Sequence, residues 1–370
     1  MKYKFYIVPP DHPQVRYQHE IVSLCEGLRL LGREFFGSCK YWLEPERNEY
    51  LLKEASGSFQ SDVDVYNTYY FAAFPEKIND VDYSKINILI DREDGLYGAY
   101  GHPQFKRFNL ILRTHYNGNI NYAYYHPNIR PWAFGLSDRI IRAIDQSAGL
   151  VPEKRVNVNF RIPHVLRDKA AAGFMPILLP VYPLNTTVTT GYDPGHPGEY
   201  SDTDRVDWVQ SGHRHDPAYY KLLNSSLLTS AFGGFVFIKP FATNRVVSQF
   251  QKYYKLKSAI LEKLRMKTSR CYFIDQYDSW RLWESFYSNT IPLHMDFRDW
   301  NFILPEMPEH KVHYWGVKGF DFDNSARELL TLHPDDVLQI AQNGKTWSKQ
   351  HYSPVAIAQR FEKLIATLHA

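Results

Sequence analysis

Polar residues between positions 278 and 285 could bind a diphosphate and a ribose. Asp278 or Ser279 can cap a helix that follows a short apolar strand. The N-terminus of such a helix presents N–H groups and a positive dipole end to an anion, and Arg281 adds a charged donor. Glu284, one turn into the helix, can accept the hydroxyls of a ribose. The segment therefore has the outline of a nucleoside diphosphate site. The alternative interpretation is a capped helix with a surface Arg281–Glu284 pair.

The elements expected to position these residues alternate between apolar strands and amphipathic helices. Strands are predicted at 3–8, 86–90, 108–112, 156–162, 206–210, 227–237, 271–274 and 291–295. Helices are predicted at 21–31, 136–151 and 354–368, and residues 185–210 have the composition of a long polar insertion. Several strands end in polar loops, which is typical of parallel sheets that bind ligands at their carboxyl edge.

This alternation occurs twice, so the chain is predicted to be an α/β protein. We expect two Rossmann-like doubly wound domains that face each other across a cleft. The first domain is placed at residues 1–150 and the second at residues 151–350. The final helix, within 351–370, is expected to pack back on the first domain.

The charge and aromatic content narrow the classes of partner. The net charge of the 370-residue chain is only +3, and nucleic-acid-binding proteins usually carry a strong basic excess. We therefore expect no nucleic acid partner. Aromatic residues make up 16% of the chain, which favours sugar binding because aromatic faces stack on the C–H faces of sugars. Large α/β cores are the alternative explanation.

The cysteines and the hydrophobicity pattern bear on the compartment. Cys25, Cys39 and Cys271 show no Cys-x-x-Cys spacing, which fits a reducing compartment and offers no zinc site. The apolar run at 3–8 is too short for a signal peptide. No stretch approaches the ~18 apolar residues of a membrane span. We expect a cytoplasmic protein with no membrane span.

Two segments resemble the exostosin-like glycosyltransferases. The run from Asp278, Asp-Ser-Trp-Arg-Leu-Trp-Glu-Ser-Phe-Tyr-Ser-Asn-Thr-Ile-Pro-Leu, is similar to the family pattern Ser-x-Arg-Leu-(Phe/Tyr)-(Asp/Glu)-Ala, continued to (Val/Ile)-Pro-(Val/Ile). It departs from that pattern at Ser285, where the family has Ala, and at Asn289, where the family has Gly. Upstream, the run that begins Gly212-His-Arg214 resembles a second family element, and Phe232-Gly233-Gly234 takes the place of the glycine loop that follows it. The resemblance covers roughly residues 205–296.

This resemblance implies a GT-B glycosyltransferase whose C-terminal domain binds a nucleotide sugar, with UDP as the default nucleotide. In the family, the arginine that corresponds to Arg214 approaches the donor phosphates. In the wider superfamily, the acidic residue that corresponds to Glu284 binds the donor ribose. The donor-binding residues expected in this chain are Arg214, Gly233, Gly234, Asp278, Ser279, Arg281 and Glu284. The acceptor expected in the N-terminal domain is a glycan, a lipid-linked glycan or a protein.

No metal or other cofactor is expected. Enzymes of this fold generally stabilise the leaving diphosphate with helix dipoles and basic side chains. The Asp-x-Asp pairs at Asp62, Asp202 and Asp321 stand in polar surroundings rather than at the end of an apolar strand. We therefore expect Arg214, Arg281 and helix N-termini to activate the donor.

A catalytic base is required if the reaction inverts the anomeric centre, because the acceptor hydroxyl must then lose its proton. Asp94 and His19 are the leading candidates, since both follow predicted strands of the first domain. Other polar residues at these strand ends are Glu20, Asp91, Glu93 and His115. Helix caps and turn formers are the alternative for each of them. The residues do not decide between inversion and retention.

Other classes of protein fit less well. A dehydrogenase or epimerase would need Gly-x-Gly-x-x-Gly after the first strand, where this chain has Pro9-Pro-Asp-His-Pro13. A P-loop and the Gly-x-Ser-x-Gly and His-Glu-x-x-His motifs are absent from the sequence. The remaining alternative is a non-catalytic carbohydrate- or nucleotide-binding protein of the same fold.

Overall fold

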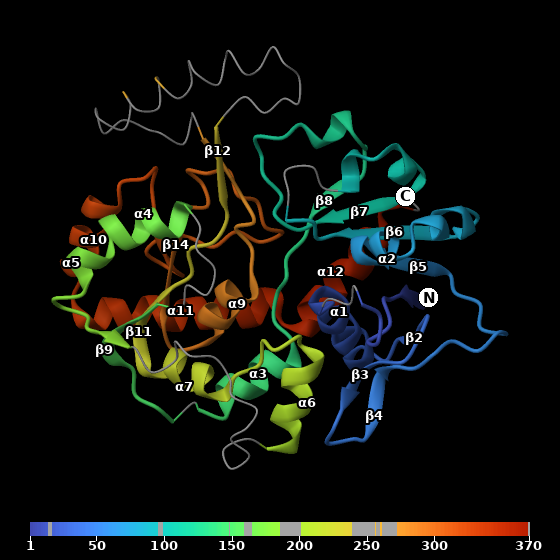
Figure 1. Cartoon of the computed structure of the whole chain (residues 1–370), viewed down its shortest axis with the longest axis horizontal. Helices are drawn as coiled ribbons and strands as arrows, with labels where there is room; N and C mark the ends of the chain where they lie inside the picture. Colours follow the sequence, from blue (N-terminus) through green and yellow to red (C-terminus); the bar gives the residue numbers. More distant parts are fainter. Residues whose placement is uncertain are drawn as a thin grey trace.

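The computed structural model describes residues 1–13, 17–94, 99–147, 149–158, 165–185, 201–238 and 272–368, together with the single residues 256 and 260. Two parallel sheets lie side by side, each flanked by helices (Figure 1). The prediction of two doubly wound α/β halves is confirmed. The domain boundaries at residues 150 and 350 stay predictions.

The first sheet has six parallel strands, and its residues alternate between two apolar layers. Its order is β2 (Glu34–Gly37), β1 (Lys2–Tyr6), β5 (Val63–Asn67), β6 (Ile86–Asp91), β7 (Leu110–Arg113) and β8 (Ile129–Pro131). Ile88 and Ile90 of β6 share a buried cluster with helix α1 (His19–Leu30). Leu89, between them, belongs to an aromatic cluster on the opposite face. This period of two is the geometry of a strand buried on both faces.

The second sheet has five parallel strands. Their order is β10 (Leu184–Asn185), β9 (Glu153–Val158), β11 (Ser226–Ser230), β14 (Ile291–Met295) and β15 (Trp315–Val317). Its helices include α4 (Val165–Gly173), α5 (Met175–Leu178), α7 (Pro217–Ser225), α9 (Trp280–Tyr287), α10 (Phe322–Leu330) and α11 (Pro334–Tyr352). In the first half, α2 spans Thr68–Ala73, and 3-10 turns lie at Pro75–Asp80, Ala99–Gly101, Pro103–Arg107 and Tyr122–Tyr124.

A separate antiparallel pair, β12 (Phe235–Ile238) and β13 (Tyr272–Asp275), stands outside both sheets. The glycine turn before β12 allows this pairing. Gly234 has a φ of +107°, and a Cβ there would lie 2.2 Å from the carbonyl oxygen of Asp275. Only glycine tolerates both the backbone conformation and the close approach.

Helices at the junction tie the two halves together. Helix α3 (Asp138–Asp145) follows β8 of the first sheet and precedes β9 of the second. Helix α12 (Pro354–Ala366) packs against α1, where a Cβ on Gly27 would lie 1.9 Å from the carbonyl oxygen of Pro354. The hydroxyl of Tyr3 in β1 donates to Glu362 of α12 at 2.9 Å. The C-terminal helix of the described chain thus covers the first sheet.

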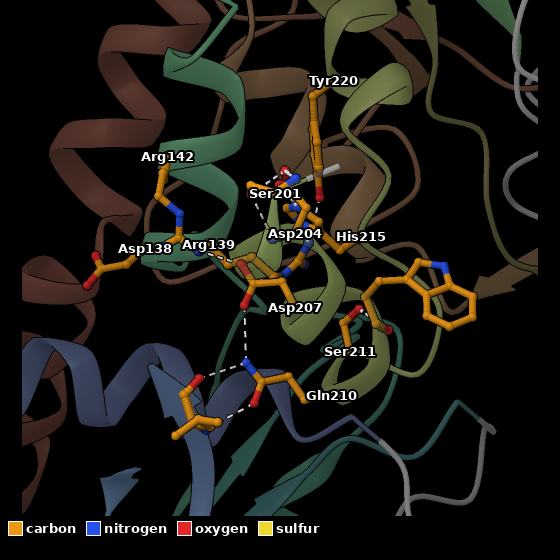
Figure 2. A network of polar contacts seen from close by, with 12 residues as sticks. Asp138, Arg139, Arg142, Ser201, Asp204, Asp207, Gln210, Ser211, His215 and Tyr220 are labelled. Carbon is orange, nitrogen blue, oxygen red and sulfur yellow. Dashed lines mark hydrogen bonds and ion pairs between the residues drawn. The ribbon is translucent and has the colours of Figure 1, made fainter. Parts of the chain in front are cut away.

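The structure differs from the sequence prediction at residues 202–210. A strand was predicted at 206–210, but the segment is helix α6 (Asp202–Gln210). Ser201 and Asp204 form a reciprocal capping box that starts the helix, and Val209 is 64% exposed. The sequence analysis also missed β5 and the hairpin of β3 (Tyr41–Glu44) and β4 (Glu49–Leu52). The hairpin contacts α6, because the Gln210 amide hydrogen-bonds both the N–H and the carbonyl of Leu43 at 3.0 Å (Figure 2).

None of the helices in the described part of the chain is both long and apolar enough to cross a membrane.

Candidate active site

The segment between β13 and α9 carries several of the predicted donor-binding residues. Ser279 is the N-cap of α9, although its side chain makes no capping hydrogen bond. Asp278 is buried: its Oδ2 accepts from the Phe134 N–H at 2.8 Å, and its Oδ1 accepts from the Trp283 indole at 2.5 Å. Burial raises the pKa of Asp278 to about 7. Asp278 therefore ties α9 to the segment after β8, and its role in donor binding stays a prediction.

Arg167 lies beside the glycine turn, within reach of the charge of Arg281. Arg281 lies in the first turn of α9, and Arg167 comes from α4, 65 residues before Phe232. The Arg167 Nε donates to the Phe232 carbonyl at 3.0 Å, directly before Gly233 and Gly234. Burial and the nearby charge of Arg281 lower the pKa of Arg167 to about 10, so it stays charged at neutral pH. A pair of cations beside a glycine turn and a helix N-terminus is suited to binding a diphosphate.

Arg167 was not among the residues selected from the sequence. It belongs to no motif there, and helix α4 begins just after six residues that the structure does not describe. Only the folded arrangement brings it to Arg281. Arg214 also lies at this helix start, because its guanidinium stands 4.8 Å from the ring centre of Trp280, the first residue of α9.

Glu284 is held by a hydrogen-bond chain that crosses three helices. Glu284 is 6% exposed, and its Oε1 accepts from the hydroxyl of Tyr220 on α7 at 3.1 Å. The Tyr220 hydroxyl in turn accepts from Nη1 of Arg139 on α3 at 2.5 Å. Figure 2 shows Tyr220 and Arg139 within a larger polar network. Sequence reasoning missed both of them, since each sits in a stretch that has only ordinary helical spacing.

Asp94 lies at the carboxyl edge of the first sheet and is connected to the α9 segment. Its side chain is 55% exposed, and its Oδ1 lies 3.4 Å from Nε2 of His115. The other ring nitrogen of His115 accepts from the Asp278 N–H at 3.2 Å, so Nε2 carries the proton when the ring is neutral. Burial raises the pKa of Asp94, but the contacts with His115 outweigh it and leave that pKa below its usual value. Asp94 is therefore an accessible carboxylate at the junction of the two halves.

His19 is placed differently from Asp94. It is fully buried, with Nε2 3.0 Å from the Gly135 carbonyl and Nδ1 3.1 Å from the Tyr17 hydroxyl. Burial, with a contribution from the charge of Arg139, lowers its pKa to about 3. Its ring stands 6.2 Å from Trp280, so it lies beside the start of α9. Its role as a base stays a prediction.

Asp275, at the end of β13, is a further residue that the sequence analysis did not select. It is 2% exposed, and its Oδ2 makes no hydrogen bond. Burial raises its pKa to about 7, despite the opposing charge of Arg113. Among the residues that the structure describes, no three His, Cys, Asp or Glu side chains converge as metal ligands. Independence from metal remains an expectation for experiment.

Comparisons with known proteins identify the fold. No protein-family model and no curated protein matches the chain. A solved structure of an alpha-glucosyltransferase with UDP-glucose and DNA containing an abasic site matches with a TM-score of 0.52 and 8% identity, over 99% of both chains. An alpha-glucosyltransferase with UDP matches with a TM-score of 0.53 and 9% identity, over 99% of this chain and 100% of that one. At these identities the likeness shows the fold, which is that of the GT-B glycosyltransferases.

A third structure corrects one sequence-based prediction. An alpha-glucosyltransferase with UDP and a 13-mer DNA containing a central A:G mismatch matches with a TM-score of 0.54 and 9% identity, over 98% of this chain and 99% of that one. Two solved structures of this fold thus contain DNA. The prediction that nucleic acid is not a partner is wrong, because it rested on a net charge of +3. Net charge sums the whole surface, whereas DNA binding depends on where the cations lie.

Proposed function

We propose that this protein is a glycosyltransferase that moves a sugar from a nucleotide-sugar donor to an acceptor hydroxyl. One observation carries the proposal: Arg167 donates to the Phe232 carbonyl directly before Gly233 and Gly234, and burial together with the charge of Arg281 lowers its pKa. A diphosphate placed between these guanidinium groups relieves their repulsion. It also gains charge-assisted hydrogen bonds.

The donor is assigned to the second half of the chain. The diphosphate lies against Arg167, Arg281 and the N-terminus of α9, with Arg214 beside Trp280 at the same end. Glu284 accepts hydroxyls of the ribose. UDP is the nucleotide proposed, since similar folds are seen with UDP and UDP-glucose. The exostosin-like resemblance supports Arg214, Arg281 and Glu284 but does not extend to Arg167, and the assignment to that family remains part of the proposal.

The acceptor hydroxyl is assigned to the first half, where Asp94 is the proposed base. In the transfer, the acceptor oxygen forms a bond to the anomeric carbon, and the bond from that carbon to the diphosphate oxygen breaks. The acceptor proton passes to the Asp94 carboxylate, which His115 orients from 3.4 Å. The departing diphosphate takes the electron pair of the broken bond, and the basic side chains and the helix dipole stabilise it without a metal.

The acceptor belongs to one of two classes. The resemblance favours the hydroxyl of a glycan, a lipid-linked glycan or a protein. The DNA-bound structures of the same fold make a hydroxyl on nucleic acid the second candidate. Both classes need the same base and the same donor site, so the assignment of residues does not depend on the choice.

The donor site is tested by binding and slow hydrolysis of UDP-, GDP-, ADP- and CMP-sugars in the presence of EDTA. Wild type is compared with Glu284→Ala and with the control Glu76→Ala, which changes an exposed glutamate far along the sequence. We expect wild type and the control to bind one donor, with EDTA making no difference, and Glu284→Ala to lose that binding. Equal binding by Glu284→Ala would remove the donor assignment. Binding without hydrolysis or transfer to any acceptor would favour the non-catalytic alternative.

A further inference from the structure

A buried arginine lies in the helix that joins the two halves. Arg139 is 1% exposed and sits in the first turn of α3. Burying a cation costs free energy unless hydrogen bonds and an opposite charge compensate for it. Burial by itself lowers the pKa of Arg139, but Tyr220, Tyr17 and Glu284 outweigh it and keep the group charged. Glu284 is the carboxylate among these groups, and it is reached through Tyr220.

The directions of the hydrogen bonds from Arg139 through Tyr220 to Glu284 are fixed by the donors and acceptors available. A guanidinium has only donors, so Arg139 donates to the Tyr220 oxygen at 2.5 Å. The Tyr220 hydroxyl then donates its own proton to Oε1 of Glu284 at 3.1 Å. Burial and the nearby carboxylate raise the pKa of Tyr220, so it keeps that proton. Hydrogen bonds arranged head to tail in a buried site strengthen one another.

A second contact holds Arg139 in place from the side of α6. Its Nη1 lies 3.3 Å from Nδ1 of His215, which must therefore be an acceptor. The other ring nitrogen of His215 then donates to Oδ1 of Asp204 at 2.9 Å. Asp204 is fixed by the capping box with Ser201 at the start of α6. Figure 2 shows Arg139, His215, Asp204 and Ser201 in this network.

We propose that Arg139 and Tyr220 are positioning residues that set the Glu284 carboxylate for the ribose hydroxyls of the donor nucleotide. The inference rests on the proposed function, because it assumes that Glu284 meets the ribose. Neither residue touches the nucleotide in this account. Their effect passes through one carboxylate oxygen, so it depends on the ribose hydroxyls and on no other part of the ligand.

The test compares Tyr220→Phe with wild type, using UDP and 2′,3′-dideoxy-UDP as ligands in equilibrium titrations. The substitution keeps the buried ring and removes only the hydroxyl. We expect it to weaken UDP binding about 10-fold, the range for a hydrogen bond to a charged group. For 2′,3′-dideoxy-UDP, which lacks the hydroxyls that Glu284 accepts, wild type and variant should bind within about 2-fold of each other.

Tyr287→Phe is the matched control. Tyr287 is also a buried tyrosine, and its hydroxyl donates to Asp145 at the other end of α3 at 3.1 Å. Its removal should leave the affinity for UDP unchanged. Should Tyr220→Phe fail to fold, Arg139→Lys is used in the same comparison, since it keeps the charge but loses the fork of donors.

The inference is overturned if Tyr220→Phe binds UDP as wild type does. An equal loss for both ligands also overturns it, because that would show a general structural effect. These outcomes differ from failure of the proposed function, in which Glu284→Ala itself leaves UDP binding unchanged. If Glu284→Ala loses affinity for UDP and Tyr220→Phe does not, the donor site stands and only the positioning role of Tyr220 is excluded.

Discussion

The arginines compared in the two halves have different charged neighbours. In the first half, Arg92 lies 3.0 Å from Glu20 and Arg113 lies 3.1 Å from Asp91, so each cation faces a buried carboxylate. In the second half, burial lowers the pKa of Arg167, and the nearby charge of Arg281 lowers it further. A cation of the first kind has its counter-charge within the protein, so removing either partner leaves the other charge buried without it. An anion placed between two like charges relieves their repulsion, which is why we propose the region around Arg167 and Arg281 as the diphosphate site.

The largest expected effect concerns catalysis, and it tests whether Asp94 of the first half acts as the general base. Asp94→Asn should lower kcat by about 10²–10⁴, the usual contribution of a general base, with the affinity for UDP unchanged. Burial raises the pKa of Asp94 while His115 lowers it more, so the net shift is downward. The base works when it is deprotonated, so in wild type the rate should hold as the pH falls from neutral and drop only below the ordinary pKa of an aspartate. A kcat within 2-fold of wild type would exclude Asp94 as the base.

The next effect concerns the stability of a paired arginine. Arg113→Met leaves Asp91 buried without its partner, because Arg113 is 2% exposed and Asp91 fully buried. Breaking such a pair costs about 3–5 kcal/mol of the free energy of unfolding, measured in urea. Arg33→Met, which breaks the exposed contact of Arg33 with Glu362, is the control and should change stability little. If both variants lost the same free energy of unfolding, the buried pair would not differ from the exposed pair in its effect on stability.

The smallest effect is expected when the free energy of unfolding is measured for a variant at Arg281. Arg281→Ala removes the charge that opposes Arg167, so the ligand-free protein should lose no stability. We expect the free energy of unfolding to stay within about 0.5 kcal/mol of wild type, or to rise. A loss as large as that of Arg113→Met would show that Arg281 is part of the fold rather than of a ligand site.

The sequence predicted the elements whose signals are local. The apolar runs around Ile88 and Leu293 are strands, and the segment from Ser279 to Glu284 is a strand-to-helix turn followed by a helix. The glycine turn at Gly233 and Gly234 was recognised from the family resemblance, and the backbone geometry at Gly234 requires glycine. The strand predicted at 206–210 failed because three apolar residues outweighed the capping signal of Ser201 and Asp204.

The contacts between distant residues could not be predicted. The charge of Arg281 reaches Arg167, and Arg139 hydrogen-bonds Tyr220, only because the fold brings their helices together. The periodicity of one helix does not predict which residues of other helices it contacts. The exclusion of nucleic acid failed for a related reason, since a total charge carries no information on where the cations lie.

The central claim is that Arg167 and Arg281 form the binding site for a donor diphosphate, and equilibrium titration of UDP and of uridine tests it most directly. Wild type should bind UDP more tightly than uridine. Arg281→Ala should weaken the affinity for UDP by about 10- to 100-fold, as expected for a lost charge-assisted contact, and leave the affinity for uridine unchanged. If Arg281→Ala binds UDP as tightly as wild type does, or loses affinity for UDP and for uridine by the same factor, the two arginines are not a diphosphate site.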